Sequence, residues 1–371
     1  MRFVSLCCAA LTVVVSSCST SLPVQREGRQ VELGELAVWY SIVFVIHGDG
    51  DYLYHDTSGN EYGADEEAVA GAKRVALLNP QAEVFIFHQR PRRNFLFLPL
   101  HDGEFYYYRN GRLVSNKLYW RDSEQSRFGT EVGLYARFHA DNQRAMTTLF
   151  LYSGHEIQEF AGTGYDHSYP DRTFNVSDLA AGLKGFAGDS ARFDLMVLST
   201  CFGGTPYTVG TLGSFARYII ASPDNLHLSY FDLGSLERLD QGLRNGDMPA
   251  FAARFAHQAF DRLTGDIQTA VSVVVYDVDR AQEFLRSARG PYDLTLTALK
   301  AEPQASMTMF EHCDCFDLPA YVLPTMDDGV DVFYRPARFG RSKDKQNHSG
   351  WGCWRERSQA SSSEISEPAS K

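Results

Sequence analysis

The sequence contains no block of basic residues and no apolar run long enough to cross a membrane. Among its 371 residues, 46 acidic side chains outnumber 35 basic ones, which gives a net charge of −11. Because no basic block offsets this charge, the composition argues against a nucleic-acid partner. Internal repeats are absent as well. The apolar content of 44% is ordinary for a globular protein, and the length suits one large domain or two modest ones.

The N-terminus predicts export and a lipid anchor. Arg2 supplies a short positive region, Phe3–Val15 is apolar, and the residues from Val15 to Cys18 have the form of a bacterial lipoprotein box. The apolar run is shorter than a spanning helix of about 20 residues, so we interpret residues 1–17 as a cleaved signal peptide. Cys18 then becomes the lipidated first residue of a polar tether that continues to residue 38. This predicts a lipid-anchored protein of the bacterial cell envelope, in the outer membrane or at the cell surface. An ordinary cleaved signal peptide is the alternative.

Cysteine is sparse beyond that segment. Cys313 and Cys315 lie close together and Cys353 follows, without the C-x-x-C spacing of zinc sites. A metal knuckle built from His312 and these cysteines is one interpretation. We favour a single disulfide from Cys353 to Cys313 or Cys315, because an exported protein enters an oxidising compartment. Cys201 has no obvious partner, as a working thiol requires.

Short apolar segments alternate with helical patterns along the chain. Such segments, bounded by polar and glycine residues, are typical of strands buried on both faces of a parallel sheet. The strands are expected in Ser41–His47, Ala82–His88, Met146–Glu156, Arg192–Gly204, Tyr218–Ala221, Val271–Tyr276, Tyr292–Ala298 and Val330–Tyr334. Helices are expected at Glu61–Leu78, Phe128–Ala145, Asn175–Phe186, Val209–Tyr218, Met248–Leu263 and Val278–Leu285. We therefore predict an α/β domain over residues 39–290, a C-terminal extension over 291–354 and a disordered tail over 355–371.

Residues 90–120 interrupt this alternation with aromatic-rich runs. Two turn signals, Asp102-Gly103 and Asn110-Gly111, divide them and predict β-hairpins. The insertion is interpreted either as a platform for a substrate or partner, or as a lid over exposed sheet.

Cys201 and His155 each follow a buried strand. One crossover helix separates the two strands, so they are expected to be parallel neighbours with adjacent tips. Catalysis in open α/β sheets gathers at that carboxyl edge. A thiol beside an imidazole is a cysteine nucleophile with its acid/base partner. The backbone N–H groups of Cys201 and Glu156 are the expected donors to the oxyanion.

The wider sequence resembles the clostripain branch of the caspase-like cysteine peptidases. The similarity extends over Ser41–Leu285 and is carried by the segments NVSDLAAGL, FDLMVLSTCFGG, SFARYIIAS and VSVVVYDVDRAQEFL. The resemblance implies a caspase-like α/β/α sandwich, with a mostly parallel central sheet, that acts as an endopeptidase on protein or peptide substrates. It further implies a thioester acyl-enzyme on Cys201, with His155 as acid/base and no required cofactor.

The chain departs from the family at positions near this dyad. Glu156 stands where the family usually has glycine, and Ser199 stands where it often has an aspartate that helps to read a basic side chain. A second acidic position falls near Ser229, with Asp224 and Asp232 as neighbouring candidates. We take Ser199, Ser229 and Asp232 as the candidate substrate-binding residues of this region. Glu156 and Ser199 also favour an alternative function, a catalytically inactive surface lipoprotein that binds protein or peptide.

A second histidine, His47, also follows an apolar strand and is followed by glycine. Chain order favours His155, because only one crossover separates it from Cys201. His47 and Asp49 are therefore candidates for lining the substrate pocket. Asp49 and Asp51 have a spacing that suits a hard cation such as Ca²⁺. A polar turn with solvated aspartates is the alternative to that metal site.

Overall fold

The computed structural model describes residues 37–48, 53–55, 61–121, 128–139, 146–159, 165–187, 192–226, 231–239, 243, 247–283, 285, 329–340 and 343. Residues 1–35 and 36–371 separate into two units by their contacts, and all described residues belong to the second. None of the helices described there is long and apolar enough to span a bilayer.

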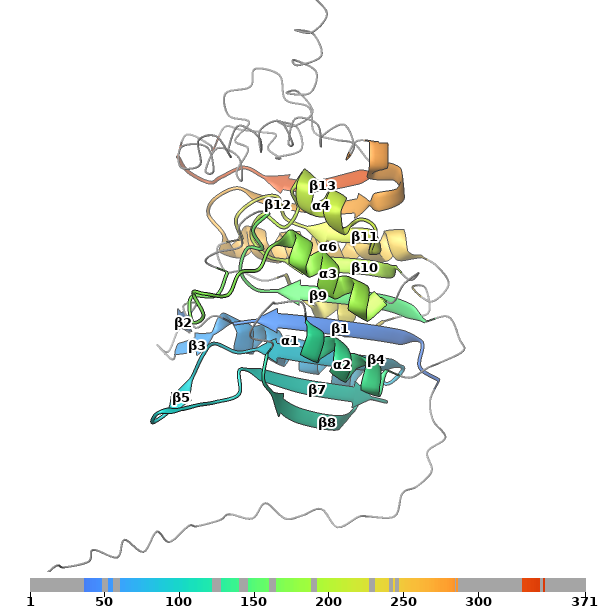
Figure 1. Cartoon of the computed structure of the whole chain (residues 1–371). Coiled ribbons are helices and arrows are strands. Elements are labelled where there is room, and N and C mark those ends of the chain that lie inside the picture. Colours follow the sequence, from blue (N-terminus) through green and yellow to red (C-terminus); the bar gives the residue numbers. More distant parts are fainter. Residues whose placement is uncertain are drawn as a thin grey trace, which may run out of the picture. The chain divides into compact units, whose positions relative to one another are not determined.

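A nine-stranded sheet forms the middle of this unit, in the order β13-β12-β11-β10-β9-β1-β4-β7-β8 (Figure 1). Its strands are β1 (Tyr40–His47), β4 (Ala82–Gln89), β7 (Gly103–Arg109), β8 (Arg112–Tyr119), β9 (Thr147–Ser153), β10 (Phe193–Ser199), β11 (Ala216–Ala221), β12 (Val271–Asp277) and β13 (Val330–Arg335). The central strands β4, β1, β9, β10 and β11 run parallel, and antiparallel strands flank them on both sides. Every residue of β1 and β4 is buried, as expected for strands covered on both faces.

Helices cover both faces of the sheet. On one face, α1 (Ala64–Leu78) and α6 (Met248–Asp266) pack over one apolar cluster. On the other face, α2 (Gly129–Phe138), α3 (Val176–Ala187) and α4 (Pro206–Leu212) contribute to a second cluster. A short 3-10 helix, η1 (Gly234–Leu236), precedes α6. The α/β/α sandwich predicted from the sequence is therefore confirmed.

Local sequence accounts for where several elements begin and end. Asn175 caps α3, because its Oδ1 accepts the N–H groups of Ser177 and Asp178, and its own N–H donates to Asp178 Oδ2. Three predicted helices are shorter than expected, and the one predicted over Phe128–Ala145 ends at Phe138. The helix expected from Glu61 begins at Ala64, because Glu61–Gly63 forms β3 and pairs with β2 (Leu53–His55).

The helix predicted over Val209–Tyr218 instead ends at Leu212. Ala216 already belongs to β11, where it pairs with Phe193 of β10. Pairing with the sheet thus overrides the apolar helical pattern at this point. The strand predicted at Tyr292–Ala298 lies outside the described residues.

Residues 90–120 extend the sheet rather than cover it. β7 pairs antiparallel with β4, and β8 forms the outer edge. The predicted turn at Asn110-Gly111 is confirmed, with φ of 54° and 67°. The turn predicted at Asp102-Gly103 is wrong, because Gly103 begins β7 and packs against the Tyr119 ring.

The second turn of this region joins β5 (Asn94–Phe95) to β6 (Leu98–Pro99). This small hairpin leaves the sheet after β4 and returns to it at β7 (Figure 1).

Candidate active site

The carboxyl ends of β9 and β10 carry the two residues predicted to react. The strands run parallel, and Ser153 pairs with Ser199 at their last shared position. His155 and Cys201 each follow these partners by two residues, so equal register brings both to the same edge of the sheet. Gly154 joins the two chain segments there, because its N–H donates to the Ser199 carbonyl oxygen at 3.4 Å. The predicted parallel neighbours are thus present.

Cys201 begins a tight turn between β10 and α4. The N–H of Phe202 donates to the Asp224 carbonyl oxygen at 3.1 Å, and the N–H of Gly204 donates to the Ser222 carbonyl oxygen at 2.8 Å. Phe202 has a φ of 52°, a conformation that a bulky residue adopts only where its surroundings impose it. These bonds fix the Cys201 turn to the loop that follows β11, the next strand of the sheet.

The sulfur of Cys201 is half-buried and lies among polar groups. Its S–H donates to Asn225 Oδ1 at 3.2 Å, and the N–H of Leu226 donates to Sγ at 3.4 Å. The backbone N–H stabilises the thiolate, whereas the amide oxygen stabilises the thiol. An amide also carries donors, so rotation of the Asn225 side chain would present an N–H to the thiolate. Both protonation states of the sulfur therefore have suitable partners within reach.

His155 lies in the bend after β9 and is half-buried, with Nε2 shielded from solvent. Its ring meets that of His167 edge-on, with centroids 5.8 Å apart and an interplanar angle of 67°. The preceding Gly154 is needed for space, because a Cβ there would lie 2.9 Å from the Cβ of His47. The φ of Glu156 is not positive. Its replacement of the family's glycine therefore introduces no left-handed strain.

His47 belongs to a buried polar network rather than to the surface of the site. The side chain is 1% exposed and stacks on Tyr165, with ring centroids 4.2 Å apart. Nδ1 lies 3.3 Å from Gln89 Oε1, and Nε2 lies 3.7 Å from Asp166 Oδ2. Contact with a substrate, as predicted from the sequence, would require this side chain to leave its buried position. In the structure, the His47 side chain fills the space next to Gly154.

The buried polar network around His47 extends to side chains from β4, β8 and α2. Gln89 donates to Glu131 Oε1 at 2.9 Å, which also accepts the hydroxyl of Tyr119 at 2.9 Å. Burial raises the pKa of Tyr119 well above its usual value and Glu131 raises it further, so the phenol stays protonated and donates. The hydroxyl of Tyr165 is hydrogen-bonded to that of Tyr152 at 2.8 Å.

One ion pair within this network is almost fully removed from water. Arg121 donates to Asp166 at 3.1 Å, and the two side chains are 4% and 0% exposed. Burial alone would lower the pKa of the Arg121 guanidinium, but Tyr165 and Asp166 beside it outweigh that effect and raise the pKa. The loop that follows His155 is therefore held by a buried charge pair.

The candidate substrate-binding residues are engaged in contacts within the chain. Ser199 is 4% exposed and its Oγ accepts the N–H of Phe231 at 2.8 Å. The Asp232 carboxylate accepts the Gly234 N–H and the side chain of Gln258. Asp224 is buried and accepts the hydroxyl of Ser272 at 2.5 Å. These contacts organise the loops beside Cys201, and recognition of a substrate by these residues stays a prediction.

Several predicted residues lie outside the described part of the chain. They are the substrate candidate Ser229, the metal candidates Asp49 and Asp51, the lipidation site Cys18, and Cys313, Cys315 and Cys353 with the proposed disulfide or metal knuckle. Within the described ranges, no group of three or more His, Cys, Asp or Glu side chains is arranged to hold a metal ion.

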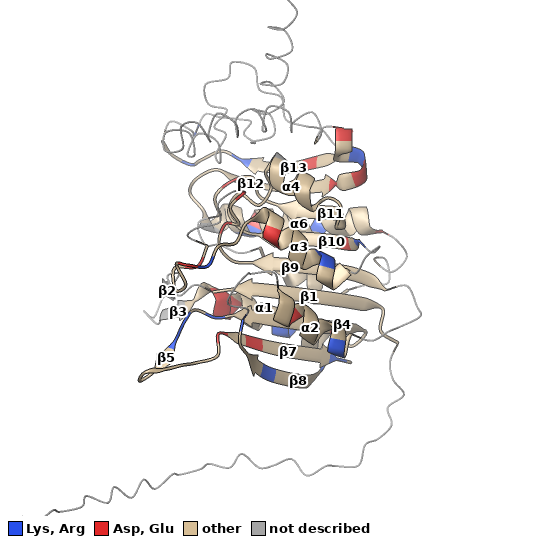
Figure 2. Ribbon diagram, viewed as in Figure 1, with Lys and Arg blue, Asp and Glu red and all other residues tan. Residues whose placement is uncertain are grey.

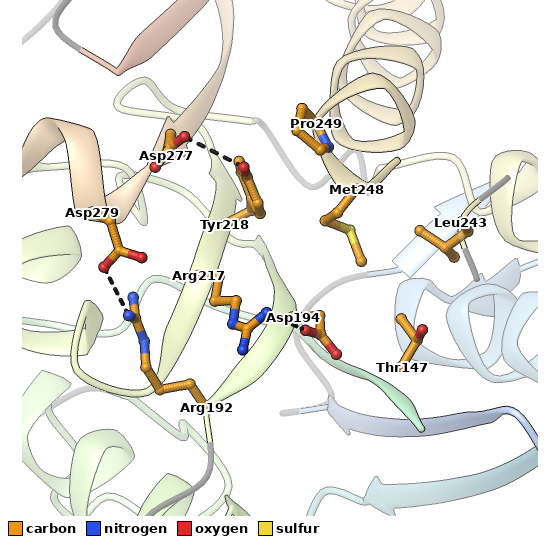
Figure 3. Close-up of a pocket in the computed structure, with 10 residues that line it drawn as sticks. All are labelled: Thr147, Arg192, Asp194, Arg217, Tyr218, Leu243, Met248, Pro249, Asp277 and Asp279. Carbon is orange, nitrogen blue, oxygen red and sulfur yellow. Dashed lines mark hydrogen bonds and ion pairs between the residues drawn. The ribbon is translucent and has the colours of Figure 1, made fainter. Parts of the chain in front are cut away.

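A cavity of 580 Å³ lies at the opposite end of the parallel strands, where β9, β10 and β11 begin (Figure 3). Arg192 pairs with Asp279 at 2.8 Å, and Arg217 pairs with Asp194 at 3.5 Å. The Tyr218 hydroxyl donates to Asp277 at 3.3 Å. Among the described residues that line this cavity there is neither cysteine nor histidine, so the candidate Cys–His pair belongs to the other edge of the sheet.

Sequence reasoning missed Asn225 and Gln89. Asn225 follows β11, whose carboxyl end neighbours that of β10, and the rule used for His155 and Cys201 would have found it. Gln89 ends β4, but its role depends on which face of the sheet its amide reaches. The strand is buried on both faces, so its sequence pattern does not reveal that orientation.

No protein-family model matches the chain, and no curated protein matches its sequence. Its structural neighbours include C11, or clostripain-like, cysteine proteases. A secreted one from Bacteroides thetaiotaomicron, in complex with an irreversible peptide inhibitor, is 12% identical over 69% of each chain, with a TM-score of 0.44. Iotapain, from the same organism, is 8% identical over 71% of this chain and 72% of that one, with a TM-score of 0.46. An inactive zymogen from Parabacteroides distasonis is 12% identical over 69% of this chain and 66% of that one, with a TM-score of 0.42.

The buried pair predicts a large loss of stability on removal of its cation. Arg121→Met leaves Asp166 buried without a countercharge and should lower the free energy of unfolding by about 3–5 kcal/mol in urea titrations at pH 7. Arg217→Met is the control, because its guanidinium is 63% exposed and its loss should cost less than about 1 kcal/mol. Equal effects of the two substitutions would show that the Arg121 pair is no more important than a surface pair.

The contact of Asn225 with the sulfur predicts a change in thiol reactivity. Asn225→Asp places a carboxylate beside Sγ, raises the pKa of the thiol and should slow alkylation of Cys201 at pH 7 about tenfold for each pKa unit. The rate is measured by mass spectrometry of the peptide that contains Cys201. Asn116→Asp adds the same charge on exposed strand β8 and should leave the rate unchanged. An unchanged rate in Asn225→Asp would remove Asn225 from the site.

Proposed function

We propose that the chain is a cysteine endopeptidase with Cys201 as the nucleophile and His155 as the acid/base. The observation that carries this proposal is the shared register of β9 and β10, which places both residues at equal positions beyond paired strand ends. The half-buried sulfur with its polar partners supports the proposal further, because a nucleophile needs both access and hydrogen bonding.

The reaction proceeds in two halves. His155 takes the thiol proton while Sγ of Cys201 attacks the peptide carbonyl carbon, and the resulting oxyanion accepts the N–H groups of Cys201 and Glu156. Collapse breaks the C–N bond, His155 protonates the leaving amine, and a thioester remains on Cys201. Water then attacks the thioester, assisted by His155, and the carboxylic acid product leaves the regenerated thiol.

Substrate and location follow the predictions from the sequence. The substrate is a protein or peptide, and no cofactor takes part in the steps above. A Ca²⁺ ion at Asp49 and Asp51 is an optional addition, which the assay below includes as a separate condition. Lipidation of Cys18 would hold the enzyme at the cell envelope, in the outer membrane or at the cell surface, without a spanning helix.

A second candidate function is binding without catalysis. The hydrogen bonds of the sulfur, donated to Asn225 and accepted from the Leu226 N–H, favour it, because the same contacts would also satisfy an inert structural thiol. In that case the protein is a surface lipoprotein that holds a protein or peptide at this edge of the sheet. Cys201→Ala would then bind uncleaved peptides with the same affinity as the wild type.

Hydrolysis of a diverse peptide library by the chain from Ser19 onward tests the proposal, with and without Ca²⁺. Cys201→Ala and His155→Ala should each lower turnover by about 10³-fold or more, because the two residues act as one unit. His257→Ala is the control, since that histidine lies on α6 with a side chain 60% exposed. Turnover that survives Cys201→Ala would remove the nucleophile, and peptide binding without any turnover would favour the second candidate.

A further inference from the structure

The hairpin formed by β5 and β6 exposes an unusual run of apolar side chains. Phe95, Leu96, Phe97 and Leu98 are 66%, 80%, 97% and 69% exposed, and Leu100 is 42% exposed. Single exposed apolar residues are common on protein surfaces, but a contiguous set of this kind marks an interaction site. We refer to residues 94–100 as the apolar hairpin.

The tip of the apolar hairpin departs from the usual chemistry of turns. Leu96 and Phe97 form a two-residue connection between paired strands, and Leu96 has a φ of 55°. Positions of this kind normally hold glycine, asparagine or aspartate, which adopt positive φ more readily. Apolar residues stand there against local preference, and such departures concentrate at functional sites.

Basic residues flank the apolar hairpin where it leaves the sheet. Arg92 and Arg93 are both exposed, and within the described part of the chain no ion pair engages either of them. Arg90 pairs with Glu104, so the acidic residue nearest along β7 is already neutralised. Figure 2 shows the blue segment at the base of β5 and the uncharged outer end of the hairpin. This local positive charge stands out in a chain with a net charge of −11.

An amphipathic aromatic residue lies beside the same base. Trp120 is 48% exposed and stacks on His101, with ring centroids 4.5 Å apart. Tryptophan is enriched where protein meets the boundary between lipid headgroups and acyl chains. An apolar tip, arginines behind it and a half-exposed tryptophan beside them are the order of side chains that an interface with lipid requires.

We propose that the apolar hairpin inserts into the outer part of an anionic lipid bilayer. Phe95, Leu96, Phe97 and Leu98 would enter the acyl boundary, while Arg92 and Arg93 contact anionic headgroups. The proposal concerns an element separate from Cys18 and requires no step of the peptidase reaction. The layered arrangement favours lipid over a second copy of this chain, because exposed arginines behind an apolar tip, with the half-exposed Trp120 beside them, match the order of headgroups and acyl chains in a bilayer.

The proposal also fixes which edge of the sheet faces the membrane. The apolar hairpin follows β4, which runs parallel to β1, and β1 runs parallel to β9. It therefore leaves the sheet at the same edge that carries His155 and Cys201. Insertion would turn that edge toward the lipid surface.

Vesicle flotation tests the proposal with the chain from Ser19 onward, so that neither the apolar N-terminal run nor a lipid on Cys18 contributes. Every helix and strand that the structure describes lies beyond residue 36, so this chain retains all of them. The vesicles are phosphatidylcholine alone and phosphatidylcholine with 30% phosphatidylglycerol. The wild type should float with the anionic vesicles, and the double variant Leu96→Asp/Phe97→Asp should lose at least about tenfold in bound fraction.

A matched control keeps the residue types constant. Leu77→Asp/Phe339→Asp changes a leucine and a phenylalanine that are 54% and 63% exposed elsewhere, and it should float like the wild type. Arg92→Gln/Arg93→Gln should lose the preference for anionic vesicles. Melting temperatures compared across the variants establish that each is folded.

Insertion depth is measured separately with brominated lipids. Phe97→Trp should show a blue-shifted, quenched signal on binding, whereas Phe339→Trp should not exceed the background from the four native tryptophans. Absence of flotation by the wild type would overturn the proposal. A dimer in size-exclusion chromatography that Leu96→Asp/Phe97→Asp abolishes, without lipid binding, would overturn it in favour of a second copy. Equal loss of flotation in the control variant would also overturn it.

Discussion

The pairing of β9 with β10 is the constraint on which the candidate site depends. Parallel strands that end in the same register deliver their next residues to the same place, and here those residues are His155 and Cys201. A slip of one residue would turn the apolar side chains of the strand toward the wrong core. Burial of Leu149 and Leu151 in one cluster and Phe150 in the other therefore also fixes the site.

Several of the side chains buried beneath the edge that carries His155 and Cys201 are polar, although this position is inside the protein. His47, Gln89 and Glu131 are buried under the bend that carries His155, and Arg121 and Asp166 extend the network into the following loop. Each of these side chains has a hydrogen-bonding or ionic partner, which buried polar groups need. Such a network restricts the positions that the loop can occupy more closely than apolar packing would, because hydrogen bonds are directional.

The sequence supports prediction of the fold more fully than of the site. Continuous apolar runs identified β1, β4, β9 and β10, and a single crossover implied that the last two are neighbours. The direction of His47 could not be predicted, because a strand buried on both faces has no polar side to orient it. The turn at Leu96-Phe97 was hidden because leucine and phenylalanine carry no turn signal. Asp102-Gly103 gave such a signal, yet packing of Gly103 against Tyr119 placed it in a strand.

The central claim is that the imidazole of His155 acts on the sulfur of Cys201. The rate of Cys201 alkylation as a function of pH, compared between the wild type and His155→Ala, tests this claim most directly. An imidazolium beside the sulfur stabilises the thiolate, so the wild type should react well below pH ~8, and the variant should shift toward the ordinary thiol midpoint near ~8.5. Identical profiles in the two proteins would contradict the pairing of these residues.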